Sequence, residues 1–162
     1  MNKIQIIVNN GAGTGSAVAV WKETKEYLQE NGISYNAYLT RYEKHAVKLA
    51  GQICGKIPQG PIYLLVVGGD GTINEVLNGI TDFDRVRLGV IPTGSGNDFA
   101  RNLGILRDTR EDLREITACI DQEQNGEKLQ RIDLGKVSWE GCEKPRIFGI
   151  SAGAGLDAIV CK

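Results

Sequence analysis

The 162-residue sequence has little of what marks several common classes of protein. It has one histidine and four cysteines without a C-x-x-C pair, so neither a zinc site nor a redox motif is indicated. The net charge is −1 and no block of basic residues stands out, which argues against a nucleic-acid partner. No run approaches the roughly 20 apolar residues of a membrane span, and no signal-peptide pattern precedes the first apolar run. We therefore expect a cytoplasmic protein with reduced cysteines.

Glycine, in contrast, is abundant, with 21 residues. Only four prolines accompany it and no G-X-Y period is present, so collagen-like and low-complexity sequences are excluded. The hydrophobic share of 41% and the charged share of 24% are ordinary for a globular domain. The glycines are therefore expected to have local roles in loops.

Apolar runs of strand length alternate with stretches of helical periodicity. Strands are expected at residues 4–9, 34–40, 61–67 and 87–91. Helical stripes are expected at residues 17–28, 46–57, 76–80, 99–103 and 109–122, the first of them ending at a glycine cap, Asn31-Gly32. Such an alternation predicts the α/β class, with a parallel βαβ nucleotide-binding sheet and helices on both faces.

The pattern changes after Gly126, where residues 129–139 and 146–152 read as strands with no helix between them. A further apolar segment follows at residues 156–160. We therefore interpret residues 1–125 as the α/β nucleotide-binding domain. Residues 126–162 are interpreted as the incomplete beginning of a β-rich second domain.

Glycine-rich loops leave the ends of three expected strands, at residues 10–15, 68–72 and 92–98. Ligands of open α/β sheets bind beyond the carboxyl ends of the strands, so these loops form the candidate site. In the second loop, glycines around Asp70 let backbone N–H groups approach an anion, and the next helix adds a positive N-terminus. An aspartate beside phosphate suits a bridging magnesium ion or water, as in phosphoryl transfer.

Helix capping is a simpler explanation for some of the same residues. Thr72 and Glu75 fit a capping box, and Ser95 with Asp98 matches a similar pattern before the next helix. Capping does not explain three glycines around one aspartate. His45, the only histidine, is expected on a helix away from the strand ends, which favours a structural role.

Two familiar nucleotide-binding patterns are absent. The first loop resembles a dinucleotide fingerprint, but Ser16 stands where its last glycine belongs, and Thr40 stands where an acidic residue would bind the ribose. Gly55-Lys56 is followed by Ile57, so no Walker A motif is formed. Dehydrogenase and P-loop folds are therefore disfavoured.

Two longer motifs identify a resemblance. GGDGTINEVLNGI (68–80) and PTGSGNDFARNLGI (92–105) resemble the paired motifs of the diacylglycerol kinase catalytic domain family, which is related to sphingosine and ceramide kinases. The family often has N-P-x-S-G after its first strand, and here residues 9–13 differ from it at Asn10 and Ala12. GGDG alone is also found in NAD kinases and phosphofructokinases.

The resemblance implies an ATP-dependent lipid kinase, which transfers the γ-phosphoryl group to a lipid hydroxyl such as that of diacylglycerol. It also implies an NAD kinase-like fold followed by a β-sandwich, transient contact with a membrane surface, and Mg²⁺. Asp70 would be the catalytic residue and would organise Mg²⁺ through water, with Asp98 and Asp133. The implied nucleotide-binding residues are Asn9, Asn10, Gly11, Gly13, Thr40, Gly68, Gly69, Gly71, Thr72, Glu75, Thr93, Gly94, Ser95 and Asn97.

Alternatives stay open at this point. The chain could be a nucleotide-binding module without catalysis, or an NAD kinase-like or sugar kinase-like enzyme on the strength of GGDG alone. The acceptor lipid and the general base are not determined. Open strand edges in an unfinished second domain would favour association into a homodimer.

Overall fold

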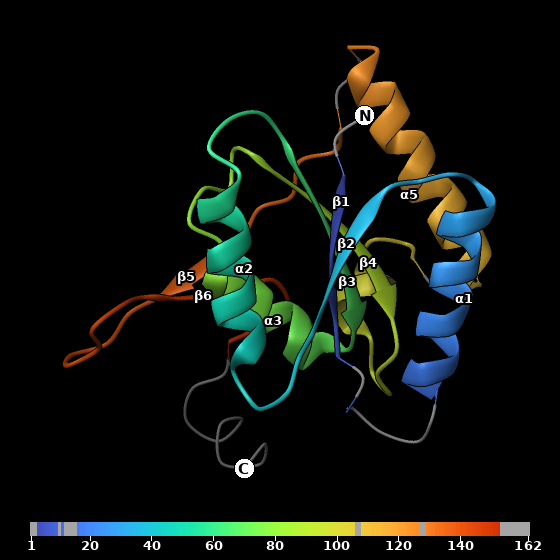
Figure 1. The fold of residues 1–162 in the computed structure, drawn as a ribbon. Helices are drawn as coiled ribbons and strands as arrows, with labels where there is room; N and C mark the ends of the chain where they lie inside the picture. The colour runs from blue at the N-terminus through green and yellow to red at the C-terminus, as the bar shows by residue number, and fades with distance from the viewer. Residues whose placement is uncertain (1–2, 10, 12–15, 106–107, 127–128, 153–162) are drawn as a thin grey trace.

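The computed structural model describes residues 3–9, 11, 16–105, 108–126 and 129–152, and it confirms the α/β class. A four-stranded sheet with all strands parallel forms the centre, in the order β2-β1-β3-β4 (Figure 1). Each strand is close to its expected position. The strands are β1 (Ile4–Val8), β2 (Tyr35–Leu39), β3 (Ile62–Gly68) and β4 (Val86–Pro92).

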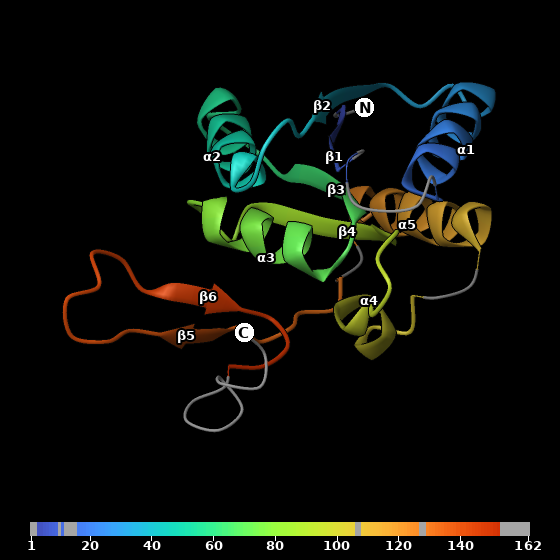
Figure 2. The ribbon, with the colours of Figure 1, turned by 90° about the horizontal axis from the view of Figure 1, so that it is seen from below.

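Helices cover both faces of this sheet, as the alternating pattern predicted. Figure 2 shows α1 and α5 on one side and α2 and α3 on the other. The bounds are α1 (Ser16–Glu30), α2 (His45–Lys56), α3 (Asp70–Gly79), α4 (Asp98–Asn102) and α5 (Thr109–Gln124).

The central strand β3 is buried over its whole length, and its side chains alternate between two cores. Leu64 and Val66 belong to the core under α2 and α3, whereas Leu65 and Val67 belong to the core under α1 and α5. A strand covered on both faces can be apolar at every position, which explains its uninterrupted apolar run. The first helix ends at the expected glycine cap, where Gly32 has a φ of +64°.

The β-rich part is smaller than expected. Only β5 (Gly135–Val137) and β6 (Arg146–Phe148) form strands in the described part of residues 126–162, as an antiparallel pair. The expected strands 129–139 and 146–152 were therefore too long. Strands β5 and β6 form a two-stranded sheet, and within the described chain no third strand pairs with either of them to extend it. The segment 156–160 lies outside the described residues. The division into domains at residues 125 and 126 stays a prediction.

The hairpin of β5 and β6 packs on α3, where the side-chain amide of Asn78 binds its backbone. Asn78 donates from Nδ2 to the Ile147 carbonyl at 2.9 Å, and its Oδ1 accepts from the Ile147 N–H at 2.9 Å. Asn78 therefore binds the backbone of β6 as a neighbouring strand would.

Cys54, Cys119 and Cys142 are free thiols, and Cys161 lies outside the described residues. Burial raises the pKa of the Cys119 thiol, and the nearby Glu115 carboxylate adds to this effect, so the thiol stays protonated and less reactive. Of the helices in the described ranges, none is long and apolar enough to cross a bilayer.

Candidate functional site

The side chain of Asn9, which follows β1, links the residue after β2 to the first turn of α3. Its Nδ2 donates to Thr72 Oγ1 at 2.8 Å, and its Oδ1 accepts from Thr40 Oγ1 and from the Gly11 N–H, both at 3.2 Å. Thr72 is 63 residues from Asn9 along the chain, yet parallel neighbouring strands bring them to one edge of the sheet. Four of the residues expected to bind nucleotide therefore meet here.

The two glycine loops after β3 and β4 touch through their backbones. A Cβ on Gly94 would lie 2.9 Å from the Gly69 Cα, and one on Gly69 would lie 3.0 Å from the Gly94 Cα. The Thr93 N–H donates to the Gly68 carbonyl at 3.1 Å and ties the same loops together. Gly69 and Gly94 are thus needed for the approach of the two loops, besides any contact with phosphate.

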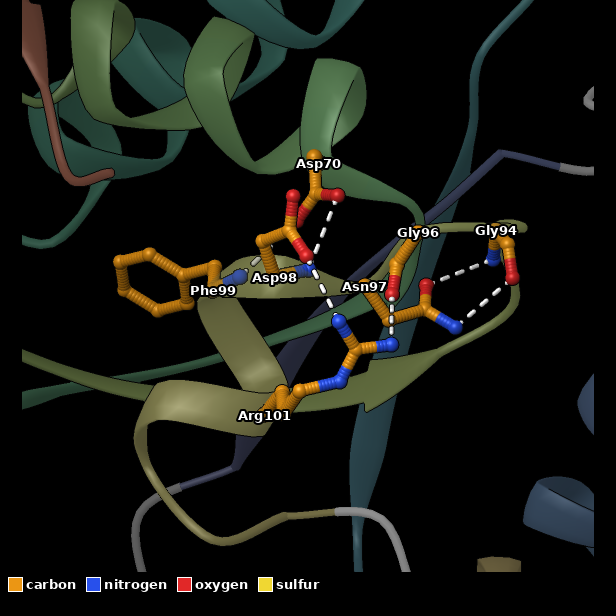
Figure 3. A network of polar contacts seen from close by, with 7 residues as sticks. All are labelled: Asp70, Gly94, Gly96, Asn97, Asp98, Phe99 and Arg101. Carbon is orange, nitrogen blue, oxygen red and sulfur yellow. Dashed lines mark hydrogen bonds and ion pairs between the residues drawn. The ribbon is translucent and has the colours of Figure 1, made fainter. Parts of the chain in front are cut away.

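Asp70 joins α3 to α4 (Figure 3). Its Oδ2 accepts from the Asp98 N–H and its Oδ1 from the Phe99 N–H, both at 3.0 Å. These are the first N–H groups of α4, which an acceptor and a negative charge stabilise. The interpretation of Ser95 and Asp98 as a cap is wrong, because α4 has no side-chain bond from its own N-cap residue and receives its acceptors from Asp70.

Asn97 fixes the shape of the loop between β4 and α4. Its φ is +54°, and its side chain forms a pair of hydrogen bonds with Gly94: Oδ1 accepts from the Gly94 N–H at 2.9 Å, and Nδ2 donates to the Gly94 carbonyl at 2.7 Å (Figure 3). Arg101 bonds Asp98 and the Gly96 carbonyl, both at 2.9 Å. The Gly94 N–H is therefore already used within the loop.

The capping box proposed for Thr72 and Glu75 is also wrong. Helix α3 begins at Asp70, so Thr72 is its third residue, and the Thr72 hydroxyl bonds Asn9. The Glu75 carboxylate accepts from the N–H groups of Lys44 at 2.9 Å and Ala46 at 3.1 Å. Glu75 therefore stabilises the beginning of α2, a helix 29 to 31 residues earlier in the chain.

Replacing Glu75 with glutamine is expected to lower the free energy of unfolding by about 1–2 kcal/mol. The amide retains one acceptor oxygen, and its NH₂ group then faces a backbone N–H that loses its acceptor. Urea denaturation measures the change, and Glu43→Gln is the matched control because Glu43 is exposed on the loop before α2. Equal stability of the two variants would contradict this role of Glu75.

The first turn of α3 offers donors to a ligand. N–H groups in the first turn of a helix have no intrahelical acceptor and lie at its positive end. Gly71 in this turn is exposed, and a Cβ there would have nothing within 4 Å. Close by in the fold, the Thr93 Oγ1 is buried and has no hydrogen-bond partner among the residues that the structure describes. A ligand oxygen would satisfy these groups.

A cavity of about 310 Å³ lies beside this turn, between α3, α4 and the chain that follows β6. Asp70, Gly71 and Asp98 line its polar side. The rest of the lining is mostly apolar, with Ile73, Leu77, Phe99, Phe148 and Ile150 as its apolar side chains. Asn74, Gly149 and Ser151 complete it.

The carboxylates expected to organise a metal ion are only partly brought together. A Cβ on Gly96 would lie 3.2 Å from Asp70 Oδ2 and 3.8 Å from Asp98 Oδ2, so these two carboxylates approach the same point. Asp133 does not complete a site, since no three His, Cys, Asp or Glu side chains in the described chain converge on a metal position. Two carboxylates fit a Mg²⁺ ion that keeps several waters and binds phosphate oxygens.

The remaining candidates are distributed as follows. Ser95 is exposed in the loop before α4, and Asn10 and Gly13 lie outside the described residues.

His45 was expected away from the strand ends, and this was wrong. It is the first residue of α2 and follows the end of β2 by a short loop, where its Nδ1 accepts from the Arg41 N–H at 3.1 Å.

Comparison with known proteins identifies the family. The profile described as "Diacylglycerol kinase catalytic domain" matches residues 3–137. The chain belongs to this family. The Bacillus subtilis protein named "Putative lipid kinase YtlR" is 34% identical over 158 residues, which cover 96% of this chain and 48% of that protein. A diacylglycerol kinase of Staphylococcus carnosus is 30% identical over 137 residues, 84% of this chain and 41% of that enzyme.

The solved structures agree with the diacylglycerol kinase family. A crystal structure of a diacylglycerol kinase from Bacillus anthracis has a TM-score of 0.59 and 29% identity, covering 72% of this chain and 39% of that one. The chain spans less than half the length of each of these family members.

Proposed function

We propose that this chain is the ATP-binding part of an ATP-dependent lipid kinase. The observation that carries the proposal is the cavity beside α3, where an exposed helix N-terminus and two carboxylates meet an apolar wall. A helix N-terminus can bind a phosphate group, and an apolar wall suits a lipid. The family match of residues 3–137 supports the same reading.

The phosphates of ATP would bind at the first turn of α3, with the exposed backbone at Gly71 and the unpaired Thr93 hydroxyl as donors. Mg²⁺, when bound, neutralises charge on the phosphates, and Asp70 and Asp98 would hold its waters. Asn9, Thr40 and Thr72 form the rigid edge against which the nucleotide lies. In the transfer, the lipid oxygen bonds to the γ-phosphorus while the bond from that phosphorus to the β–γ bridging oxygen breaks, and its electron pair leaves with ADP. The hydroxyl proton is released to water.

The lipid acceptor, such as diacylglycerol, would approach through the apolar side of the cavity. Phe99, Phe148 and Ile150 line this side and suit the glycerol backbone and the first carbons of an acyl chain. Such an acceptor lies in a bilayer, so we also propose transient contact with a membrane surface. We further propose that residues 1–125 form the nucleotide domain and that residues 126–162 belong to a second, β-rich domain.

The proposal predicts Mg²⁺-dependent binding of ATP to this chain, weakened at least about tenfold by Gly71→Val. The Cα–Cβ bond in a helix tilts toward its N-terminus, so the valine side chain would occupy the space in front of the free N–H groups. Apart from its chain neighbours and the helix's own backbone, no atom of the described residues lies within 4 Å of a Cβ on Gly71, so the melting temperature should change little. Isothermal titration calorimetry with and without Mg²⁺ measures the binding.

Gly55→Val is the control, because Gly55 is an exposed helical residue of α2 with open space around it. It should bind ATP as the unmodified chain does. Absence of ATP binding to the unmodified chain, or full binding to Gly71→Val, would contradict the proposed phosphate site.

A further inference from the structure

The loop between β2 and α2 carries an exposed aromatic pair beside the candidate site. Tyr42 is 54% exposed, although its ring contacts another ring. Its ring stacks on His45, with the centroids 4.4 Å apart and the planes at 24°. The loop leaves the carboxyl end of β2, so the pair lies at the edge of the sheet where Asn9 and Thr40 meet.

The backbone of this loop is held in a strained shape. The His45 N–H donates to the Tyr42 carbonyl at 3.2 Å, which closes a turn, and Lys44 in that turn has a φ of +64°, where glycine is favoured. Hydrogen bonds from the Arg41 N–H to His45 Nδ1 and from the Lys44 N–H to Glu75 fix this conformation. Strain that persists because its surroundings fix it is typical of ligand sites.

Both ends of the loop are tied to α3. Thr40 reaches Thr72 through Asn9, and the N–H groups of Lys44 and Ala46 bond the Glu75 carboxylate. Thr72 and Glu75 lie within one turn of the helix whose N-terminus is the proposed phosphate site. The position of the aromatic pair is therefore fixed relative to that site.

We propose that Tyr42, supported by His45, is the surface on which the base of ATP stacks. This inference rests on the proposed function. Bases stack on exposed aromatic side chains, and a ring already held by a neighbour loses little freedom when it binds. The Lys48 ammonium lies 5.4 Å from the centroid of the Tyr42 ring, and Lys48 is exposed. A base that displaces the ammonium from the ring would therefore leave it in water and not as a buried charge.

The test compares two probes, ATP and tripolyphosphate, which has the phosphates without the base. Calorimetry with Mg²⁺ is carried out on the unmodified chain, Tyr42→Ala, Tyr42→Phe and Gly71→Val. We expect Tyr42→Ala to weaken ATP about tenfold and to change tripolyphosphate less than about twofold. Tyr42→Phe retains the ring and should bind ATP normally, whereas Gly71→Val should weaken both probes.

Three other results would contradict the stacking of the base on Tyr42. If Tyr42→Ala weakens both probes equally, Tyr42 only supports the loop and the inference is wrong. If Tyr42→Ala binds ATP normally while Gly71→Val does not, the inference is wrong and the proposed function stands. If the unmodified chain binds neither probe, the proposed function fails, and the inference fails with it.

Discussion

Replacement of Gly79 by alanine is expected to destabilise the chain by about 3 kcal/mol or more. Gly79 ends α3 where it packs on α2, and a Cβ there would lie 2.2 Å from the Val47 carbonyl oxygen and 2.8 Å from the Ala50 Cβ. Both neighbours belong to the body of α2, so the helices must separate to admit one methyl group. Overpacking of a well-packed core typically costs 1–3 kcal/mol, and displacement of backbone costs more.

Gly55→Ala is the matched control, because it makes the same chemical change inside α2. A Cβ on Gly55 would meet nothing within 4 Å, so the gain in helix propensity should stabilise the chain by roughly 0.5–1 kcal/mol. Urea denaturation followed by circular dichroism compares the two variants. A Gly79→Ala variant as stable as the unmodified chain would show that the α2–α3 contact is looser than described.

Asp70→Asn is expected to weaken the binding of Mg²⁺-ATP and to reduce stability at the same time. The two carboxylate oxygens accept from the Asp98 and Phe99 N–H groups, and asparagine offers one oxygen for both. The N–H left without an acceptor should cost about 1–3 kcal/mol. In a longer chain with kinase activity, loss of the charge near Mg²⁺ should abolish phosphoryl transfer.

Asp98→Asn tests the proposed metal role of the carboxylates without the loss of stability at α4 that is expected of Asp70→Asn. The Asp98 carboxylate is exposed and pairs only with the exposed side chain of Arg101 in the described structure, so its loss should change stability by less than about 1 kcal/mol. It should nevertheless weaken Mg²⁺-ATP if the carboxylates hold waters of the ion. If Asp70→Asn binds Mg²⁺-ATP with normal affinity, Asp70 has no role in holding the metal ion. If Asp70→Asn is as stable as the unmodified chain, the Asp70 carboxylate does not stabilise the start of α4.

The strands and helices could be predicted because their signals are local. The apolar run of β3 and the glycine at the end of α1 each depend on neighbours in sequence, and both were found where expected. The C-terminal strands were predicted too long because strand length depends on the ladder with neighbouring strands, and only β5 and β6 pair in the described part. His45 was misplaced because the short loop before α2 has no periodic signal of its own.

The sequence by itself determined the α/β class, the glycine loops at the strand ends and the family motifs, because each follows from residues close together in the chain. The tertiary structure alone decided what the polar side chains of these loops bond. Asp70 bonds the start of α4, 28 and 29 residues onward, and Glu75 bonds the start of α2. These partners depend on the strand order β2-β1-β3-β4, which sets the loops that become neighbours at the sheet edge. Local pattern carries no information on that order, so only the folded chain reveals that Asp70 and Glu75 hold the site together.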